Sequence, residues 1–168
     1  PVVYLDVQTP VFVNQQFAVR ILIDTPVPLN AFSVVLRYPG DYLEFIRVNE
    51  GHSLINVWQG KPVLRRDGEI QFVGGSFTPF QGTGGELLTI YFKARKVGTA
   101  DINLPSAAAY IADGKGTQVI PDIKNNSVKI EGAGSGSPEA TPPLFASEIT
   151  PPEIQTLEFI PDPFNPAQ

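Results

Sequence analysis

Short segments rich in β-branched and aromatic residues, each bounded by turn residues, run from Pro1 to about Glu131. The clearest of them are Gln16–Asp24, Ala31–Tyr38 and Glu86–Ala94. Segments of this composition are typical of strands, and many of them separated by Gly and Pro turns are typical of a β-sandwich. We therefore expect residues 1–131 to form an all-β, antiparallel sandwich.

The expected strands follow one another at short intervals. They are Val2–Val7, Gln16–Asp24, Ala31–Tyr38, Leu43–Asn49, Pro62–Arg66, Glu69–Gly74, Glu86–Ala94, Thr99–Leu104, Ala108–Ala112, Gln118–Ile120 and Ser127–Glu131. Tight turns are predicted at Asp67–Gly68, a hairpin signal, and at Asp113–Gly116. No helix longer than a turn or two is predicted, because the best segment, Ser53–Trp58, has no sustained helical period.

The Gly-rich stretch Gly74–Gly85 has some features of a phosphate-binding loop. It lacks the Gly-Lys-Ser/Thr ending of that motif and leads into an expected strand rather than a helix. We interpret it as a long loop between two strands, in which Phe77 and Phe80 anchor the loop or form a contact surface.

The charged residues are unevenly distributed. Residues 1–131 carry 12 acidic and 12 basic side chains, and the rest carries five acids and no Lys or Arg, so the net charge of −5 belongs to the C-terminal part. The densest basic cluster is only Lys93, Arg95 and Lys96, so no nucleic-acid surface is expected. No apolar stretch approaches the roughly 20 residues of a membrane span.

The composition changes at residues 132–138, a Gly/Ser linker. Eight of the 17 prolines lie from Pro138 onward, which argues against a second core and favours an extended, polyproline-like acidic tail over residues 139–168. The tail also keeps apolar residues, and Gln155–Ile160 alternates well enough to form one strand.

We expect four apolar residues of this tail to dock as an added strand or in a groove: Ile154, Leu157, Phe159 and Ile160. Docking on the chain's own sandwich is favoured, because a short linker gives the tail a high effective concentration. Docking on a neighbouring molecule would instead build a filament or surface layer, which is a third functional hypothesis.

The chain contains no cysteine, so the sandwich must be stable through its apolar core alone. It begins at Pro1 rather than at a methionine, which fits a processed protein or a piece of a longer one. We expect an exported protein that lies outside the cell or on its surface.

Seven segments carry a further pattern in their order along the chain: Asn14–Ile23, Leu29–Tyr38, Asp41–Gly51, Asp67–Phe72, Gly85–Ala94, Gly98–Leu104 and Asn126–Ile130. This order resembles that of cohesin domains, the jelly-roll receptor modules of bacterial scaffolding proteins. The resemblance covers residues 2–131 and implies a jelly-roll-like sandwich. It also implies a protein-attachment function in which one sheet face contacts a dockerin-like partner. No residue of that face is marked by a short motif.

Catalytic candidates are few. His52 is the only histidine, and it has Glu50 and Ser53 near it in sequence, but no triad order or nucleophile elbow accompanies it. We interpret His52 as part of a polar loop and expect no enzymatic activity. For metals, Asp113, Asp122 and the glycines beside Lys115 offer oxygen ligands to calcium, although their spacing matches no calcium loop and a structural turn is favoured.

The same two-sheet scaffold is shared with several carbohydrate-binding modules, so polysaccharide binding is the alternative hypothesis. It requires an exposed row of aromatic rings, for which the candidates are Trp58, Tyr42, Phe77, Phe80 and Tyr110. We favour the interpretation that these rings anchor the core or the loops, because large aromatic side chains contribute heavily to burial in a sandwich; contact with a ligand or a protein partner is the alternative.

Overall fold

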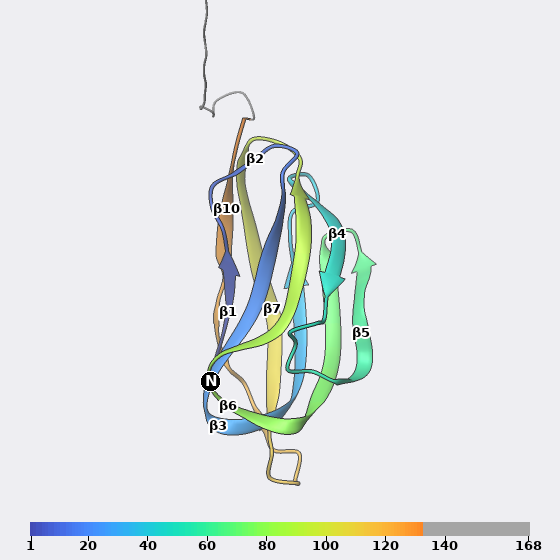
Figure 1. Ribbon diagram of the computed structural model, residues 1–168, viewed down its shortest axis with the longest axis vertical. Coiled ribbons are helices and arrows are strands. Elements are labelled where there is room, and N and C mark those ends of the chain that lie inside the picture. The colour runs from blue at the N-terminus through green and yellow to red at the C-terminus, as the bar shows by residue number, and fades with distance from the viewer. Residues whose placement is uncertain (133–168) are drawn as a thin grey trace, which may run out of the picture. The chain divides into compact units, whose positions relative to one another are not determined.

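The chain is all-β over the residues that the computed structural model describes, residues 1–132 (Figure 1). Within them the strands are β1 (Val2–Val7), β2 (Val11–Phe12), β3 (Gln16–Arg37), β4 (Leu43–Asn49), β5 (Val57–Arg66), β6 (Glu69–Ala94), β7 (Gly98–Ile111), β8 (Gln118–Val119), β9 (Asp122–Lys124) and β10 (Asn126–Glu131). The expected strand class is confirmed, and two expected strands, Val2–Val7 and Leu43–Asn49, have the observed bounds. The Pro-rich tail and its expected strand Gln155–Ile160 lie outside the described residues.

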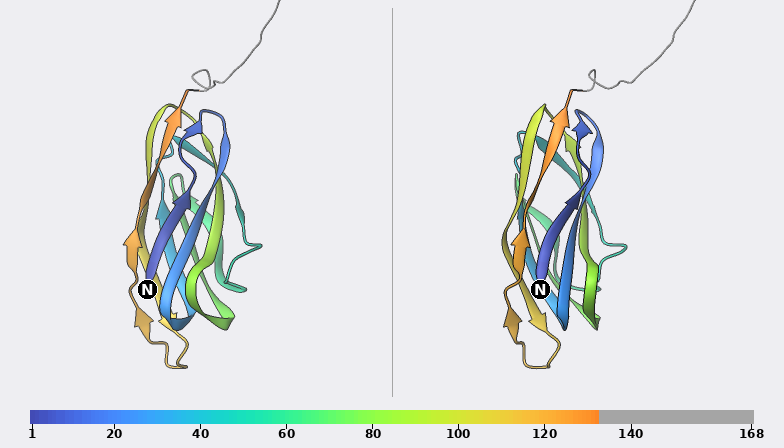
Figure 2. Two further views of the ribbon diagram at one scale, coloured as in Figure 1. Left: turned by 60° about the vertical axis from the view of Figure 1, so that its left-hand side comes forward. Right: turned by 90° about the vertical axis from the view of Figure 1, so that its left-hand side faces the viewer.

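Two long strands, β3 and β6, run through both layers of the sandwich. The first half of β3 pairs with residues 85–93 of β6, and the second half, Ala31–Arg37, pairs with residues 69–75. Both strands turn from one layer into the other at the same end of the sandwich (Figure 1 and Figure 2). One sheet therefore has the order β9-β1-β3-β6-β4 and the other has the order β5-β6-β3-β7.

The expectation that Gly74–Gly85 forms a loop is wrong, because this segment is the middle of the continuous strand β6. Its pairing with β3 continues at Gly75 and again at Gly82, with register shifts where both strands bend. Gly82 and Gly84 have φ values of 137° and 68°, which side chains with a Cβ rarely adopt. The glycines therefore allow a strand to turn a corner rather than end there.

Most strand pairs are antiparallel, as expected, and two short ones are parallel. Strand β9 lies parallel to β1, and β2 lies parallel to β10. With three and two residues, these strands are too short to show an alternating pattern in the sequence. The segment Ser53–Trp58 is not helical, and its last two residues begin β5. Residues 1–132 include no helix with the length and hydropathy needed to cross a membrane.

The predicted hairpin at Asp67–Gly68 is confirmed. It joins β5 to β6, with Arg66 opposite Glu69, and Gly68 has a φ of 90°. The turn therefore fixes the edge strand β5 beside the first half of β6.

The core lies between the two sheets. Its largest fully buried side chains include Phe32, Phe72 and Phe92. The ring centroid of Phe92 lies 4.8 Å from that of Tyr38 and 6.2 Å from that of Phe17, so rings from β3 and β6 meet directly. Burial of this apolar surface stabilises the sandwich and holds the outer faces of both sheets in place.

Candidate functional site

The predicted aromatic residues do not form one row. Trp58 is half-buried, and its ring packs edge-on against the buried ring of Phe72, with the centroids 6.0 Å apart. It therefore points toward the interior at the edge of the sandwich. Tyr110 lies on the outer face of the same sheet, opposite Ala31 of β3. Trp58 and Tyr110 thus project from opposite faces of the sheet.

The other three rings are also dispersed. Phe77 is 81% exposed at the bend of β6, while Phe80 is partly buried and packs against the core. Tyr42 lies in the turn before β4, and the ammonium of Lys96 is 4.6 Å from its ring centroid. The predicted contact residues are therefore distributed over several surfaces, and only Tyr110 belongs to the docking face described below.

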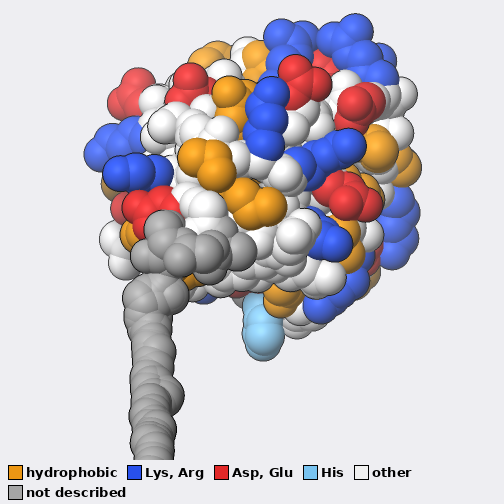
Figure 3. Space-filling model, turned by 90° about the horizontal axis from the view of Figure 1, so that it is seen from above, with side chains coloured by type: hydrophobic (Ala, Val, Ile, Leu, Met, Phe, Trp, Pro, Cys, Tyr) orange, Lys and Arg blue, Asp and Glu red, His pale blue; other side chains and the backbone are white. Residues whose placement is uncertain are grey.

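The surroundings of His52 are those of a turn. His52 is exposed, and in the end-on view of Figure 3 the single histidine projects sideways from the rim of the domain. The Ser53 hydroxyl donates to the carbonyl oxygen of Leu87 at 2.5 Å and accepts from the amide of Ile55 at 2.9 Å, and Glu50 pairs with Lys61 at 3.0 Å. Both groups beside His52 therefore serve local structure.

The calcium candidates are not brought together. The Asp113 carboxylate accepts from the Thr117 hydroxyl and from the Lys115 amide, and these hydrogen bonds lower its pKa. Asp122 lies in β9, where its amide donates to the carbonyl oxygen of Pro1. Among residues 1–132 there is no group of three or more His, Cys, Asp or Glu side chains that could hold a metal ion.

Lys and Arg side chains alternate with Asp and Glu on the end of the sandwich shown in Figure 3. Charges of both signs therefore lie side by side on this end.

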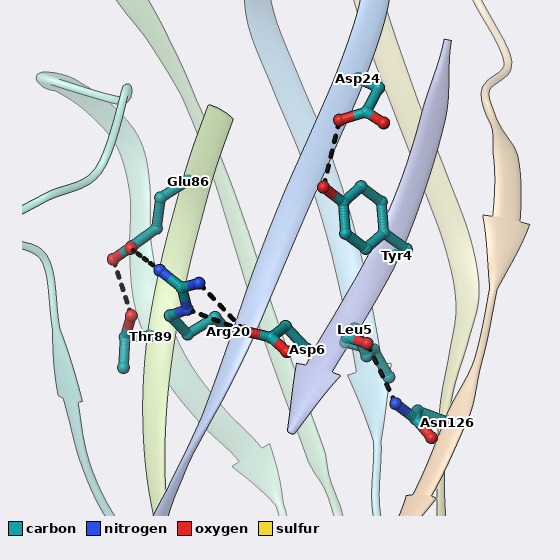
Figure 4. A network of polar contacts seen from close by, with 8 residues as sticks. All are labelled: Tyr4, Leu5, Asp6, Arg20, Asp24, Glu86, Thr89 and Asn126. Atoms are coloured by element: carbon teal, nitrogen blue, oxygen red, sulfur yellow. Dashed lines mark hydrogen bonds and ion pairs between the residues drawn. The ribbon is translucent and has the colours of Figure 1, made fainter. Parts of the chain in front are cut away.

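The outer faces of the two sheets differ in chemistry. On the β1-β3-β6 sheet, Arg20 pairs with Asp6 at 3.0 Å and with Glu86 at 3.5 Å, and Glu86 also accepts from the Thr89 hydroxyl at 2.7 Å (Figure 4). The hydrogen bond to Asp6 is the main cause that raises the pKa of Arg20. Asp6, Arg20, Glu86 and Thr89 are therefore paired with one another on this face.

The outer face of the β5-β6-β3-β7 sheet has no charged side chain in its centre. Cross-strand pairing places Ser33 between Val73 and Ala108, and Val35 between Gln71 and Ser106. We call the following residues the docking face: Ala31, Ser33, Val35, Val57, Val63, Gln71, Val73, Ala108 and Tyr110. All of them are half-buried or exposed. Among residues 1–132, the side chains of Ser33 and Gln71 have no hydrogen-bond partner.

A shallow hollow of about 400 Å³ lies at one end of the docking face. Its lining includes Val57, Val73, Gly75 and Tyr110. Most of the lining residues are apolar or glycine, so the hollow can receive an apolar group.

The other end of the docking face is charged. The Glu69 carboxylate, whose side chain is 6% exposed, accepts from Nε of Arg37 at 2.9 Å. Arg65 and Arg66 lie 3.6 and 3.4 Å from the same carboxylate. The bond from Arg37 is the main cause that lowers the pKa of Glu69. Three guanidinium groups therefore surround one carboxylate, and each of them remains more than half exposed.

Comparison with known proteins identifies the fold. No family model and no curated protein sequence matches the chain. Solved structures do match. One is a cohesin module from a family 33 glycoside hydrolase of Clostridium perfringens, with a TM-score of 0.65 at 14% sequence identity. The match covers 76% of this chain and 94% of the cohesin module. The seventh ScaB type I cohesin from Pseudobacteroides cellulosolvens has a TM-score of 0.64 at 18% identity, covering 83% and 95%.

A third match is the sixth cohesin from scaffoldin B of Acetivibrio cellulolyticus, solved in complex with a Cel5 dockerin. It has a TM-score of 0.63 at 14% identity and covers 78% of this chain and 100% of its own. At these identities the likeness concerns the backbone arrangement, and it agrees with the resemblance in strand order. The chain therefore has the cohesin fold.

Proposed function

We propose that the protein is a non-catalytic attachment module that binds a protein partner of dockerin type through the docking face. The observation that carries the proposal is the uncharged centre of this face on an otherwise charged domain. Interface centres are depleted of charged residues, and an exposed apolar patch on a soluble domain marks an interaction surface. The opposite outer face, with its ion pairs around Arg20, lacks this property.

The size of the docking face fits a protein better than a small ligand. Four strands about 4.8 Å apart and seven residues of about 3.3 Å each give an area of about 20 by 20 Å. This is about half of the roughly 800 Å² that each partner contributes to a standard interface. The arginine end and the neighbouring turns supply the remainder, as a charged rim around an apolar centre.

The cohesin with which this chain shares its fold was solved bound to a dockerin, which supports a partner of that type. A carbohydrate-binding function has less support, because the rings of Trp58 and Tyr110 lie on opposite faces of their sheet. We place the module outside the cell or on its surface. Protease treatment of intact cells, followed by immunodetection of the module, tests this location.

The partner is tested directly by immobilising the full chain and passing over it the secreted fraction of the source organism and a panel of purified dockerin modules. We expect one or a few dockerin-type proteins to be retained with dissociation constants in the micromolar range or below. Recovery of polysaccharide alone, with no protein partner, would contradict the proposal.

A further inference from the structure

Cross-strand pairing arranges the docking face and its charged end in rows, and the two outer rows differ in chemistry. One row lines the apolar hollow: Val57, Gly75, Ala31 and Tyr110. The row at the other end is polar: Arg66, Glu69, Arg37 and Asn103. Arg37 follows Ala31 by six residues of β3, which is about 20 Å along the strand. A partner that contacts both rows must match an apolar site and a charged site at this separation.

Only one of the three arginines at the charged end is needed to hold Glu69. Nε of Arg37 donates to the buried carboxylate of Glu69 at 2.9 Å. Arg65 and Arg66 approach the same carboxylate only at 3.6 and 3.4 Å, and their side chains are 53% and 67% exposed. Exposed ion pairs of this kind contribute little to stability, because the charges remain solvated. The two arginines of β5 are therefore largely surplus to the structure of this end.

The three guanidinium groups keep unused hydrogen-bond donors. A guanidinium has five N–H groups, and Arg37 bonds to Glu69 through Nε–H alone. Among residues 1–132, Glu69 is the only carboxylate within ion-pair distance of the three arginines, and the neighbouring Asp101 forms no ion pair. Guanidinium groups bind carboxylates through two parallel hydrogen bonds, with a gain in both energy and geometric specificity. This end can therefore receive a second carboxylate from another molecule.

The rest of the docking face favours apolar groups. The hollow at the far row takes an apolar side chain, whose burial there removes apolar surface from water. Between the two rows lie Ser33, Val35 and Ala108, none of which can pair with a charge from a partner. A buried charge without a partner is costly, so an acidic side chain on this face is stable only beside the arginines.

We propose that Arg65 and Arg66, together with Arg37, form a carboxylate-binding site that selects the partner of the docking face. The partner places an Asp or Glu side chain against these guanidinium groups and an apolar side chain in the hollow about 20 Å away. Partners with Lys or Arg at the first position are rejected by like charge. This inference rests on the proposed function, because it takes the same face as the contact surface, and it adds the charge that the partner must carry.

The first test uses a short acidic peptide as a probe and needs no natural partner. Triglutamate with blocked ends is titrated into the full chain, and the arginine Nε–H signals are followed by ¹H–¹⁵N NMR. We expect the signals of Arg37, Arg65 and Arg66 to shift, while that of Arg47, an exposed arginine of β4 that stacks on Tyr91, stays unchanged. Triglutamine with blocked ends should shift none of them. Equal shifts at Arg47 and at the arginines of β5 would overturn the proposal.

The second test reads partner choice from a displayed library of random peptides selected on the immobilised full chain. The wild type should enrich peptides that combine Asp or Glu with large apolar residues. Arg65→Gln with Arg66→Gln should lose the acidic preference, and Arg65→Glu with Arg66→Glu should replace it by a basic one. The first variant keeps the bond between Arg37 and Glu69, so its urea midpoint should equal that of the wild type. The control Arg47→Glu should keep the acidic preference, and peptides of the same charge from wild type and both β5 variants would refute the site.

Purified dockerin modules separate this inference from the attachment function. For a dockerin that the wild type retains, we expect Arg65→Gln with Arg66→Gln to weaken binding about tenfold. Full affinity in this variant, for a dockerin that Ala108→Glu fails to bind, would overturn the carboxylate site and leave the attachment function intact. Retention of no dockerin would contradict the proposed partner, while the two peptide tests would still decide the carboxylate site.

Discussion

Gly74 holds the edge strand β5 close to β6, and replacing it with alanine tests how this side of the docking face is built. An ideal Cβ at Gly74 would lie 2.7 Å from the carbonyl oxygen of Val57 and closer still to Cγ2 of Ile55, which is buried. The Val57 carbonyl belongs to the backbone of β5, so it can move only if the strand moves. We expect Gly74→Ala to destabilise the fold by about 1–3 kcal/mol, as overpacking of a core does.

Gly60, in the same sheet, provides the matched control. A Cβ at Gly60 has no neighbour closer than the Val73 side chain and backbone at 3.9 Å, which is ordinary contact. Its backbone conformation is also open to other residues, because its φ is not positive. Gly60→Ala is therefore expected to be neutral or to stabilise by up to about 1 kcal/mol, since alanine loses less conformational entropy than glycine on folding.

Urea unfolding followed by tryptophan fluorescence measures both variants. Trp58 is the only tryptophan, and its ring packs on Phe72 next to the substituted position, so its emission reports on β5 directly. The expected loss corresponds to a fall of about 0.5–2 M in the urea midpoint of Gly74→Ala. Equal midpoints for Gly74→Ala and Gly60→Ala would refute the argument that the missing side chain sets the distance between β5 and β6.

Three further predictions concern stability. Phe92 is fully buried, so Phe92→Ala should lower the free energy of unfolding by about 3–5 kcal/mol. The ring of Phe77 is 81% exposed, so Phe77→Ala should change the free energy of unfolding by less than about 0.5 kcal/mol. Calorimetry of the two variants measures both effects. The pKa of Glu69 is lowered in the folded state, so its contribution to stability is present above its ordinary pKa of 4.5 and is lost as the pH falls through the lower pKa of the folded state. Between pH 7 and pH 3, the free energy of unfolding should therefore fall less for Glu69→Gln than for the wild type. An equal fall in both proteins would argue against this role of Glu69. Asn14 has a φ of 72°, so Asn14→Gly should be neutral or stabilising in urea unfolding while Asn14→Ala should cost about 1 kcal/mol, and the reverse order would be evidence against strain at this turn.

The sequence is sufficient to predict the strands that alternate regularly and end at clear turns. Val2–Val7 and Leu43–Asn49 are of this kind, and their bounds agree with the structure. The continuity of β6 through Gly74–Gly85 could not be predicted, because glycine-rich composition is a local signal for a turn. Only the pairing of this segment with β3, which is distant in sequence, shows that the strand bends and continues.

The docking face depends on the same kind of non-local information. Ser33, Val73 and Ala108 belong to three different strands, and each is unremarkable in its own segment. A sequence signal does exist in the alternation of small or uncharged residues at 31, 33 and 35 with buried ones at 32, 34 and 36. The aromatic residues, apart from Tyr110, do not predict the docking face, because residue type alone does not indicate whether a side chain such as Trp58 points inward or outward.

The central claim is that the docking face, and not the opposite outer face, binds the protein partner. Two half-buried alanines offer a matched pair: Ala108 lies in the centre of the docking face, and Ala18 lies opposite Tyr91 on the outer face of the other sheet. Isothermal titration of the captured partner into Ala108→Glu and Ala18→Glu is the most direct measurement. We predict at least about a tenfold loss of affinity for Ala108→Glu, or about 1.4 kcal/mol, and less than about a twofold change for Ala18→Glu. Full affinity in Ala108→Glu, or an equal loss in both variants, would contradict the account.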